Sequence, residues 1–260
     1  MNIHDQFTTG LDPLWQITET GQGGVVRRHG SLHLSLPTAE AASYSNAQIT
    51  SYDPKTSQFQ FRAPLRLSVT AFSSLHPSDL KGTAGFGFWN HPFEPGQWWR
   101  LQPQALWFFF GSPPNNMPLA DGVPGHGWKA ATFDAKRKRG LALLPLAPLG
   151  VLLMRFPMLY RLLWPMGQAA IGVNEVLLDP ALLNSEQTYT LEWRPETARF
   201  SVDGKVVMET KRPPRGALGF IAWMDNQYRI VTPQGQFGGG LVDVPRPQSL
   251  VLSEIKIEAI

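Results

Sequence analysis

The feature that most constrains this chain is the stretch 188–210, TYTLEWRPETARFSVDGKVVMET, which has the pattern of a complete β-hairpin. Apolar and polar residues alternate through 189–194 and continue to alternate from Phe200 onward, the period of strands with one buried face. Asp203-Gly204 tolerates the positive φ that a two-residue hairpin turn requires. The sequence therefore predicts antiparallel strands here, and 23 prolines and 24 glycines between short strands extend that prediction along the chain.

The same stretch carries a wider pattern. A strand ends in Glu192-Trp193, a short turn follows at Pro195-Glu196, and the next strand has the sequence RFSVDGK. This pattern resembles that of concanavalin A-like lectins and family-sixteen glucanases, whose last strands would correspond to 215–225 and 250–257. The resemblance implies an all-β fold, a concanavalin A-like jelly-roll β-sandwich. We expect one domain over residues 1–260, with a mostly helical hydrophobic insertion at 136–170.

The strand that should carry catalysis departs from this resemblance. Family-sixteen glucanases place carboxylates at alternate positions of one strand, where they act as nucleophile and acid/base. The corresponding segment here, residues 105–110, has the sequence ALWFFF, and the nearest acids, Glu94 and Asp121, lie well outside it. Hydrolysis by the two-carboxylate mechanism is therefore not expected.

Aromatic side chains replace those carboxylates, and they predict a concave groove that holds a sugar face or an apolar chain. The preceding segment 83–92, TAGFGFWNHP, contains glycines that allow a ligand or a backbone to approach closely. Plain core packing is the alternative for the aromatic residues. The predicted ligand-binding residues are Phe88, Asn90, Trp107, Phe109, Trp223 and Asn226.

Asp225 is the acid predicted to carry any chemistry, because an apolar groove would raise its pKa and let it donate a proton. His91 and Tyr228 are predicted to assist it. A salt bridge to Arg229 or a turn-capping role is the alternative for Asp225, and a turn role is the alternative for His91. The chain has no cysteine, which excludes thiolate sites, and we expect no metal and no cofactor.

The segment 136–167 has no counterpart in the resemblance. At 100° per residue, one helical face gathers Leu149, Leu152, Leu153, Phe156, Leu159, Tyr160, Leu163 and Trp164, while Arg155 and Arg161 fall on the other face with Met158 and Leu162 between them. Six basic residues and no acid lie between Ala135 and Asn174, which leaves 17 of the 23 basic residues against all 20 acidic ones elsewhere. Prolines interrupt the apolar run, so the segment suits an interfacial membrane anchor better than a span. The predicted membrane contacts are Lys136, Arg137, Lys138, Arg139, Arg155, Phe156, Arg161 and Trp164.

Two other interpretations of this insertion are a hydrophobic lid on the sandwich and a homo-oligomer contact. Nucleic-acid binding is not expected, because four consecutive basic residues are a small footprint and the apolar run behind them would have no role. The absence of cysteine and of a signal-like start in MNIHDQFTTGLDPLW favours a cytoplasmic location, with peripheral contact to an anionic membrane.

Two functions from different classes follow. The first is a binding module whose aromatic groove takes an amphiphilic small molecule, a glycan or the glycan of a lipid. The second is an enzyme for a lipid, isoprenoid or glycolipid substrate, with Asp225 as acid/base. Replacing Asp225 by asparagine separates these hypotheses, because a binding protein would keep its affinity and an enzyme would lose turnover.

Overall fold

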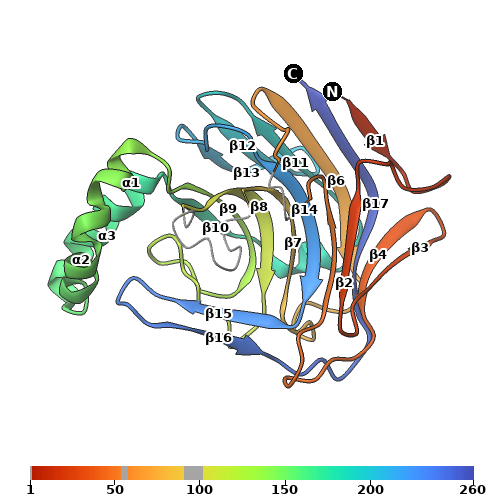
Figure 1. The fold of residues 1–260 in the computed structure, drawn as a ribbon, viewed down its shortest axis with the longest axis horizontal. Coiled ribbons are helices and arrows are strands. Elements are labelled where there is room, and N and C mark those ends of the chain that lie inside the picture. The colour runs from red at the N-terminus through yellow and green to blue at the C-terminus, as the bar shows by residue number, and fades with distance from the viewer. Residues whose placement is uncertain (1, 54–57, 91–101) are drawn as a thin grey trace.

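The computed structural model describes residues 2–53, 58–90 and 102–260, which form two antiparallel sheets packed face to face (Figure 1). The eight-stranded sheet has the order β13 (Lys205–Thr210), β12 (Ala198–Val202), β11 (Gln187–Trp193), β6 (Leu65–Ser73), β17 (Gln248–Ala259), β4 (Ser31–Leu36) and β3 (Gly24–Arg28), and β1 (Ile3–Asp5) also pairs with β17. The seven-stranded sheet has the order β10 (Asn174–Leu177), β9 (Gly127–Asp134), β8 (Gln104–Gly111), β7 (Thr83–Trp89), β14 (Gly219–Asp225), β5 (Asn46–Thr50) and β2 (Gln16–Thr20). The predicted β-sandwich is therefore confirmed.

The hairpin predicted from sequence forms the edge of the eight-stranded sheet. Strands β11 and β12 are antiparallel neighbours, with Tyr189 opposite Val202. Strand β12 then connects to β13 through a turn at Asp203 and Gly204. These two residues have φ values of 47° and 77°, the left-handed conformation of a type I′ turn. The Asp203 carboxylate also accepts the backbone N–H of Thr188 at 2.8 Å, which ties the turn to the start of the hairpin.

Aromatic residues from both sheets fill the space between them. Phe86 of β7 packs edge-on against Tyr189 with ring centroids 5.3 Å apart, and Phe108 of β8 packs against Phe200 at 5.5 Å. Phe88 is fully buried in the same core, 5.8 Å from the ring of Trp193. The prediction that Phe88 binds ligand is wrong, because the alternation along β7 turns its side chain into the sandwich.

The helical insertion lies between β9 and β10, where Figure 1 shows it projecting from one end of the sandwich. It consists of α1 (Lys138–Leu143), the 3₁₀ turn η2 (Leu144–Leu146), α2 (Ala147–Leu153) and α3 (Pro157–Ile171). Proline stands in the first turn of η2, α2 and α3, where its missing N–H is not needed, and Gly172 ends α3 in a left-handed conformation. A further 3₁₀ turn, η3 (Pro180–Leu183), leads into β11.

A second hairpin, β15 (Gln227–Val231) and β16 (Phe237–Leu241), extends from the end of β14 toward the insertion (Figure 1). The sequence predicts a glycine-rich loop for 234–240, but Gly238, Gly239 and Gly240 pair with β15 as a strand. Glycines carry no alternating side chains, so the periodic pattern of a strand is lost at these positions.

Candidate functional site

The outer face of the seven-stranded sheet, turned away from the sandwich core, carries a cluster of aromatic residues. Trp107 and Phe109 project from β8 and Trp223 from β14, with the Trp223 ring centroid 5.8 Å and 6.0 Å from the other two. These rings meet across β7 because the β7 positions between them are glycines. A Cβ on Gly85 would lie 2.8 Å from the Trp223 ring and 2.4 Å from the carbonyl oxygen of Phe108.

This aromatic cluster is closed. The side chains of Trp107, Phe109 and Trp223 are only 7 to 8% exposed, and partly buried hydrophobic residues pack over them: Trp89, Met117, Leu119 and Val173. The prediction of an open aromatic groove is therefore wrong in this structure. Exposing an apolar sheet face of this size to water is unfavourable, and residues that follow β8 and precede β10 cover it.

A buried ion pair holds that cover in place. Lys129 of β9 and Glu175 of β10 lie 2.9 Å apart, with side chains 1% and 2% exposed. The Lys129 ammonium also donates to the carbonyl oxygen of Pro124 at 2.7 Å, and Glu175 accepts the backbone N–H groups of Leu119 and Ala120 at 2.9 Å each. Burial lowers the pKa of Lys129, and the charge of Glu175 opposes that shift.

A polar edge adjoins the aromatic cluster at the end of β14. Asp225 accepts the hydroxyl hydrogen of Thr83 at 2.7 Å, the backbone N–H of Gln227 at 3.1 Å and its side-chain amide at 2.9 Å. Trp223 donates its indole N–H to the Thr83 hydroxyl at 2.9 Å, which links this edge to the aromatic cluster. Burial raises the pKa of Asp225 to about 6, while the bonds from Thr83 and Gln227 favour the ionised form and oppose the shift.

Strand β5 completes this edge. Asn46 pairs directly with Asp225, and its side-chain carbonyl oxygen is buried without a hydrogen-bond partner among the described residues. Tyr44 precedes it and is 37% exposed. Its hydroxyl lies beside Asp225 and Gln227, and burial, followed by the negative charge of Asp225, raises its pKa. We call Tyr44, Asn46, Thr83, Asp225 and Gln227 the Asp225 edge.

Several predicted site residues lie elsewhere. Asn226 is fully buried, and its amide bonds to the carbonyl oxygens of Glu40 and Ser43 and to the backbone N–H of Ser45, so it fixes the loop that carries Tyr44 and does not bind ligand. Asn90 is also buried, where it bonds to the backbone at both Gln102 and Gln104.

Of the two residues predicted to assist Asp225, Tyr228 is not found beside it. Tyr228 lies against Gly240 of β16, and the phenol next to Asp225 belongs to Tyr44. The predicted salt bridge to Arg229 does not form either, because Arg229 donates to the side-chain oxygen of Gln227 at 2.6 Å. His91 lies outside the described residues.

The carboxylates of the seven-stranded sheet do not form a hydrolytic pair. Its described strands contain four acids: Glu19, Asp134, Glu175 and Asp225. Only Glu175 and Asp225 share the outer face, and they stand four strands apart, which is at least about 19 Å at the usual strand spacing. Glycosidase carboxylates lie within about 10 Å of each other. Glu175 is also engaged by Lys129.

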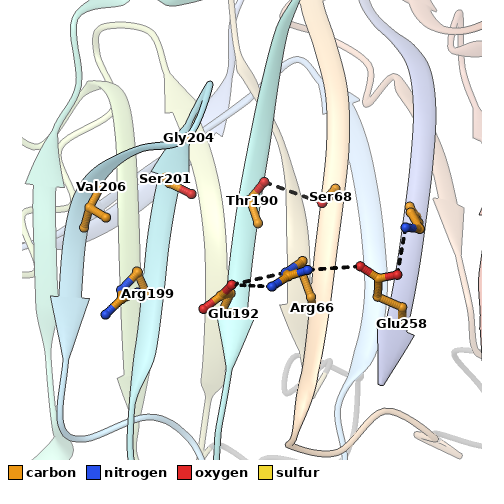
Figure 2. Close-up of a pocket in the computed structure, with 10 residues that line it drawn as sticks. Arg66, Ser68, Thr190, Glu192, Arg199, Ser201, Gly204, Val206 and Glu258 are labelled. Carbon is orange, nitrogen blue, oxygen red and sulfur yellow. Dashed lines mark hydrogen bonds and ion pairs between the residues drawn. The ribbon is translucent and has the colours of Figure 1, made fainter. Parts of the chain in front are cut away.

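A concave surface lies on the exposed face of the eight-stranded sheet. This depression of about 470 Å³ is lined by polar residues of β6, β11, β12 and β17 (Figure 2). Arg66 lies between Glu192 and Glu258, at 2.7 Å and 3.3 Å, and Lys256 bonds to Glu258 at 2.7 Å. These charges already neutralise one another, so the depression offers a ligand less than the Asp225 edge does.

Comparison with solved structures agrees with this architecture. An endo-β-1,3-glucanase from Pyrococcus furiosus superposes with a TM-score of 0.56 at 10% identity, covering 98% of this chain and 92% of that one. A structure titled as an endo-acting O-glycanase of the human gut microbiota gives 0.56 at 13% identity, covering 99% and 98%. The carbohydrate recognition domain of Emp47p gives 0.51 at 13% identity, covering 99% and 94%.

The chain has the concanavalin A-like jelly-roll fold. These identities are low, so the likeness concerns the fold and leaves the site to be argued from its own residues. No protein-family model matches the sequence, and comparison with curated proteins finds no match.

Tyr44, Asn46, Thr83 and Gln227 are the residues of the site that sequence analysis missed. A signal for two of them is present in the sequence of residues 43–49, where Tyr44, Asn46 and Gln48 alternate with small or apolar residues. That alternation places the three side chains on one face, but it does not say which neighbouring strand they meet.

Proposed function

We propose that this chain binds a carbohydrate at the Asp225 edge. The observation that carries the proposal is the buried carbonyl oxygen of Asn46, which has no partner among the described residues and stands beside the Asp225 carboxylate. A buried acceptor without a donor is costly, and a ligand hydroxyl would satisfy it when binding opens the edge to the ligand. Two acceptors on adjacent strands suit two neighbouring hydroxyls of a sugar ring.

Tyr44 supplies the second element of such a site. It is a partly exposed aromatic residue at this edge, and an aromatic ring can pack against the apolar face of a sugar. Gln48 follows on the same face of β5, opposite Trp223, and is partly exposed. An aromatic platform with a few convergent polar groups is the usual composition of a small-ligand site.

Non-catalytic binding is favoured over glycan hydrolysis, because the outer face of the described strands lacks a second carboxylate within reach of Asp225. The structural neighbours include an endo-β-1,3-glucanase, an O-glycanase and a carbohydrate recognition domain. These neighbours support glycans as the ligand class to test first.

Calorimetric titration tests the proposal with oligosaccharides of β-1,3-glucan, mixed-linkage β-1,3-1,4-glucan and mucin O-glycans. Wild-type protein should bind at least one of them. Asn46→Ala should weaken that binding roughly tenfold, since it removes one buried acceptor. Asn184→Ala, at an exposed residue after η3, is the matched control and should bind as the wild type does. Equal affinity of Asn46→Ala and the control would contradict the proposed site.

A second candidate function rests on the pKa of Asp225. A value of about 6 makes both protonation states available near neutral pH, which suits an acid/base on a glycolipid, lipid or isoprenoid substrate. Tyr44 would be the assisting group, in place of the predicted Tyr228. Asp225→Asn should then abolish turnover while leaving substrate affinity unchanged. Loss of affinity without any detectable turnover in the wild type would favour the binding function.

A further inference from the structure

Exposed apolar side chains are concentrated on the helical insertion. Among the described residues, ten of the seventeen large hydrophobic residues that are exposed lie between Leu141 and Met166. Six of these ten are 54 to 80% exposed and form what we call the insertion patch: Leu146, Leu149, Phe156, Met158, Leu162 and Met166. Single exposed hydrophobic residues are ordinary on protein surfaces, but a concentration of this kind marks an interaction surface.

The opposite side of the insertion is fixed to the sandwich. Tyr160 donates its hydroxyl hydrogen to Asp121 at 3.0 Å, and Gln168 donates its side-chain amide to the carbonyl oxygen of Leu119 at 2.8 Å. Trp164 stacks on Tyr160 with ring centroids 6.5 Å apart, on this anchored side of α3. The other side of α3 is exposed. It carries Met158, Leu162 and Met166, which lie in a row because they are spaced four residues apart.

The β15–β16 hairpin widens this exposed surface. A Cβ on Gly235, in the turn of the hairpin, would lie 2.5 Å from a methyl group of Val151 in α2, so the two elements are in contact. Phe237, two residues further along, is 70% exposed.

Positive charge accompanies the insertion patch. Lys136, Lys138, Arg139, Arg155 and Arg161 are exposed, and none of them has an ion-pair partner among the described residues. No acid occurs in the sequence between Ala135 and Asn174. The insertion therefore presents an apolar surface together with unneutralised basic side chains.

None of the described helices is long and apolar enough to cross a bilayer. The longest helix of the insertion, α3, has 15 residues, and both its first turn and its interior contain proline. Exposed leucine, methionine and phenylalanine next to lysine and arginine is the composition of a surface that lies in the interface of a bilayer.

We propose that the insertion patch docks on an anionic lipid surface, with its apolar side chains in the interface and its basic side chains at the headgroups. A second copy of this chain is a poorer occupant. A symmetric dimer would bring the same patch of both copies together, and with it five exposed, unpaired basic side chains from each. Anionic headgroups instead neutralise that charge, and each basic residue near the surface strengthens the contact.

Vesicle co-sedimentation tests this proposal, with one set of vesicles of pure phosphatidylcholine and another containing about one-third phosphatidylserine. Wild-type protein should bind the anionic vesicles at least about tenfold more tightly than the neutral ones, and added salt should reduce that difference. The double variant Lys138→Glu/Arg139→Glu should lose at least about tenfold in affinity for anionic vesicles. Met158→Ser/Leu162→Ser should lose a comparable factor on the same vesicles, since it removes two exposed apolar side chains.

Two control variants match these changes outside the insertion. Arg28→Glu/Lys205→Glu reverses two exposed charges on β3 and β13, and Val206→Ser removes an exposed apolar residue of β13. Both should bind anionic vesicles as the wild type does, and all variants should keep the wild-type thermal unfolding temperature. The proposal is overturned if wild-type protein ignores anionic vesicles, or if the insertion variants bind as the controls do. A concentration-dependent dimer in sedimentation velocity that Met158→Ser/Leu162→Ser dissolves, without vesicle binding, would instead make the patch a subunit interface.

Discussion

The hydroxyl of Thr83 donates to the carboxylate of Asp225 at 2.7 Å, from the strand that lies beside it in the seven-stranded sheet. The same hydroxyl accepts the indole N–H of Trp223 at 2.9 Å. Thr83 therefore joins the closed aromatic cluster to the Asp225 edge, and its hydrogen bond favours the ionised form of the buried carboxylate.

Replacing Thr83 by valine keeps the side-chain shape and removes both hydrogen bonds. We expect the pKa of Asp225 to rise above its value of about 6, because a bond that favours the ionised form is lost. The free energy of unfolding should fall by about 1–3 kcal/mol, since the Trp223 indole N–H loses its buried acceptor. Urea unfolding and NMR titration of the carboxyl group measure the two effects. Thr190→Val, on the polar face of the eight-stranded sheet, should change neither quantity.

The pKa of Asp225 also predicts a pH dependence of stability. Its folded value of about 6 lies above the ordinary value of 3.8, so the folded state binds this proton more tightly than the unfolded state does. The resulting stabilisation is complete below pH 3.8 and is lost as the pH rises through about 6. Asp225→Asn cannot ionise. As the pH rises across that range, the unfolding free energy of the wild type should therefore fall by about 3 kcal/mol relative to that of this variant.

Urea unfolding of both proteins at a series of pH values measures this difference directly. Other groups titrate in both proteins and cancel in the comparison. Parallel pH profiles for the wild type and Asp225→Asn would show that the carboxylate is not desolvated as the structure indicates.

The buried Lys129–Glu175 pair predicts a large effect from a single substitution. Lys129→Met leaves the Glu175 carboxylate buried without its cation and should cost about 3–5 kcal/mol of unfolding free energy. The loop that covers the aromatic cluster should loosen at the same time, so tryptophan emission should shift to longer wavelength. The double variant Lys129→Met/Glu175→Gln should recover most of the stability. Failure of the double variant to recover would mean that the loss comes from packing around Lys129 and not from the unpaired charge.

The pH dependence of carbohydrate binding separates the Asp225 edge from other surfaces. An ionised carboxylate accepts two hydroxyl hydrogens, whereas the protonated form loses part of that capacity. Affinity should therefore fall as the pH is lowered through about 6 in the wild type and stay level over the same range in Asp225→Asn. Calorimetry at several pH values checks this, and a level profile for the wild type would argue against a role of Asp225 in binding.

Much of the fold could be predicted from local patterns. Asp203-Gly204 between two alternating segments specifies a type I′ hairpin, and that hairpin with its Glu192-Trp193 ending resembles proteins that have the fold observed here. The apolar sequence of β8 correctly showed that its outer face carries no carboxylates. These features are local, because turn geometry and the period of two are set by residues next to each other in the chain.

The site was harder to predict, because its residues come from four strands. Asn46 meets Asp225 through the register between β5 and β14, and Thr83 meets it from β7. No pattern within one strand specifies which strand lies beside it. The closure of the aromatic cluster likewise depends on Leu119, whose backbone N–H is held by Glu175 more than fifty residues later.

The insertion shows a different limit. Helical periodicity groups Leu159, Leu163 and Trp164 on one face, and this face packs toward the sandwich, while Met158 and Leu162 are exposed. Both faces of α3 are apolar, so periodicity finds a helix but cannot say which face is covered.

Chemical-shift mapping of the bound oligosaccharide tests the central claim most directly. On titration with the sugar that binds in calorimetry, the side-chain amide of Asn46 and the indole N–H of Trp223 should shift together, because both belong to or adjoin the Asp225 edge. The guanidinium signal of Arg66, in the depression on the eight-stranded sheet, should not move. Shifts at Arg66 with Asn46 and Trp223 unchanged would contradict this account and move the binding site to the opposite face of the sandwich.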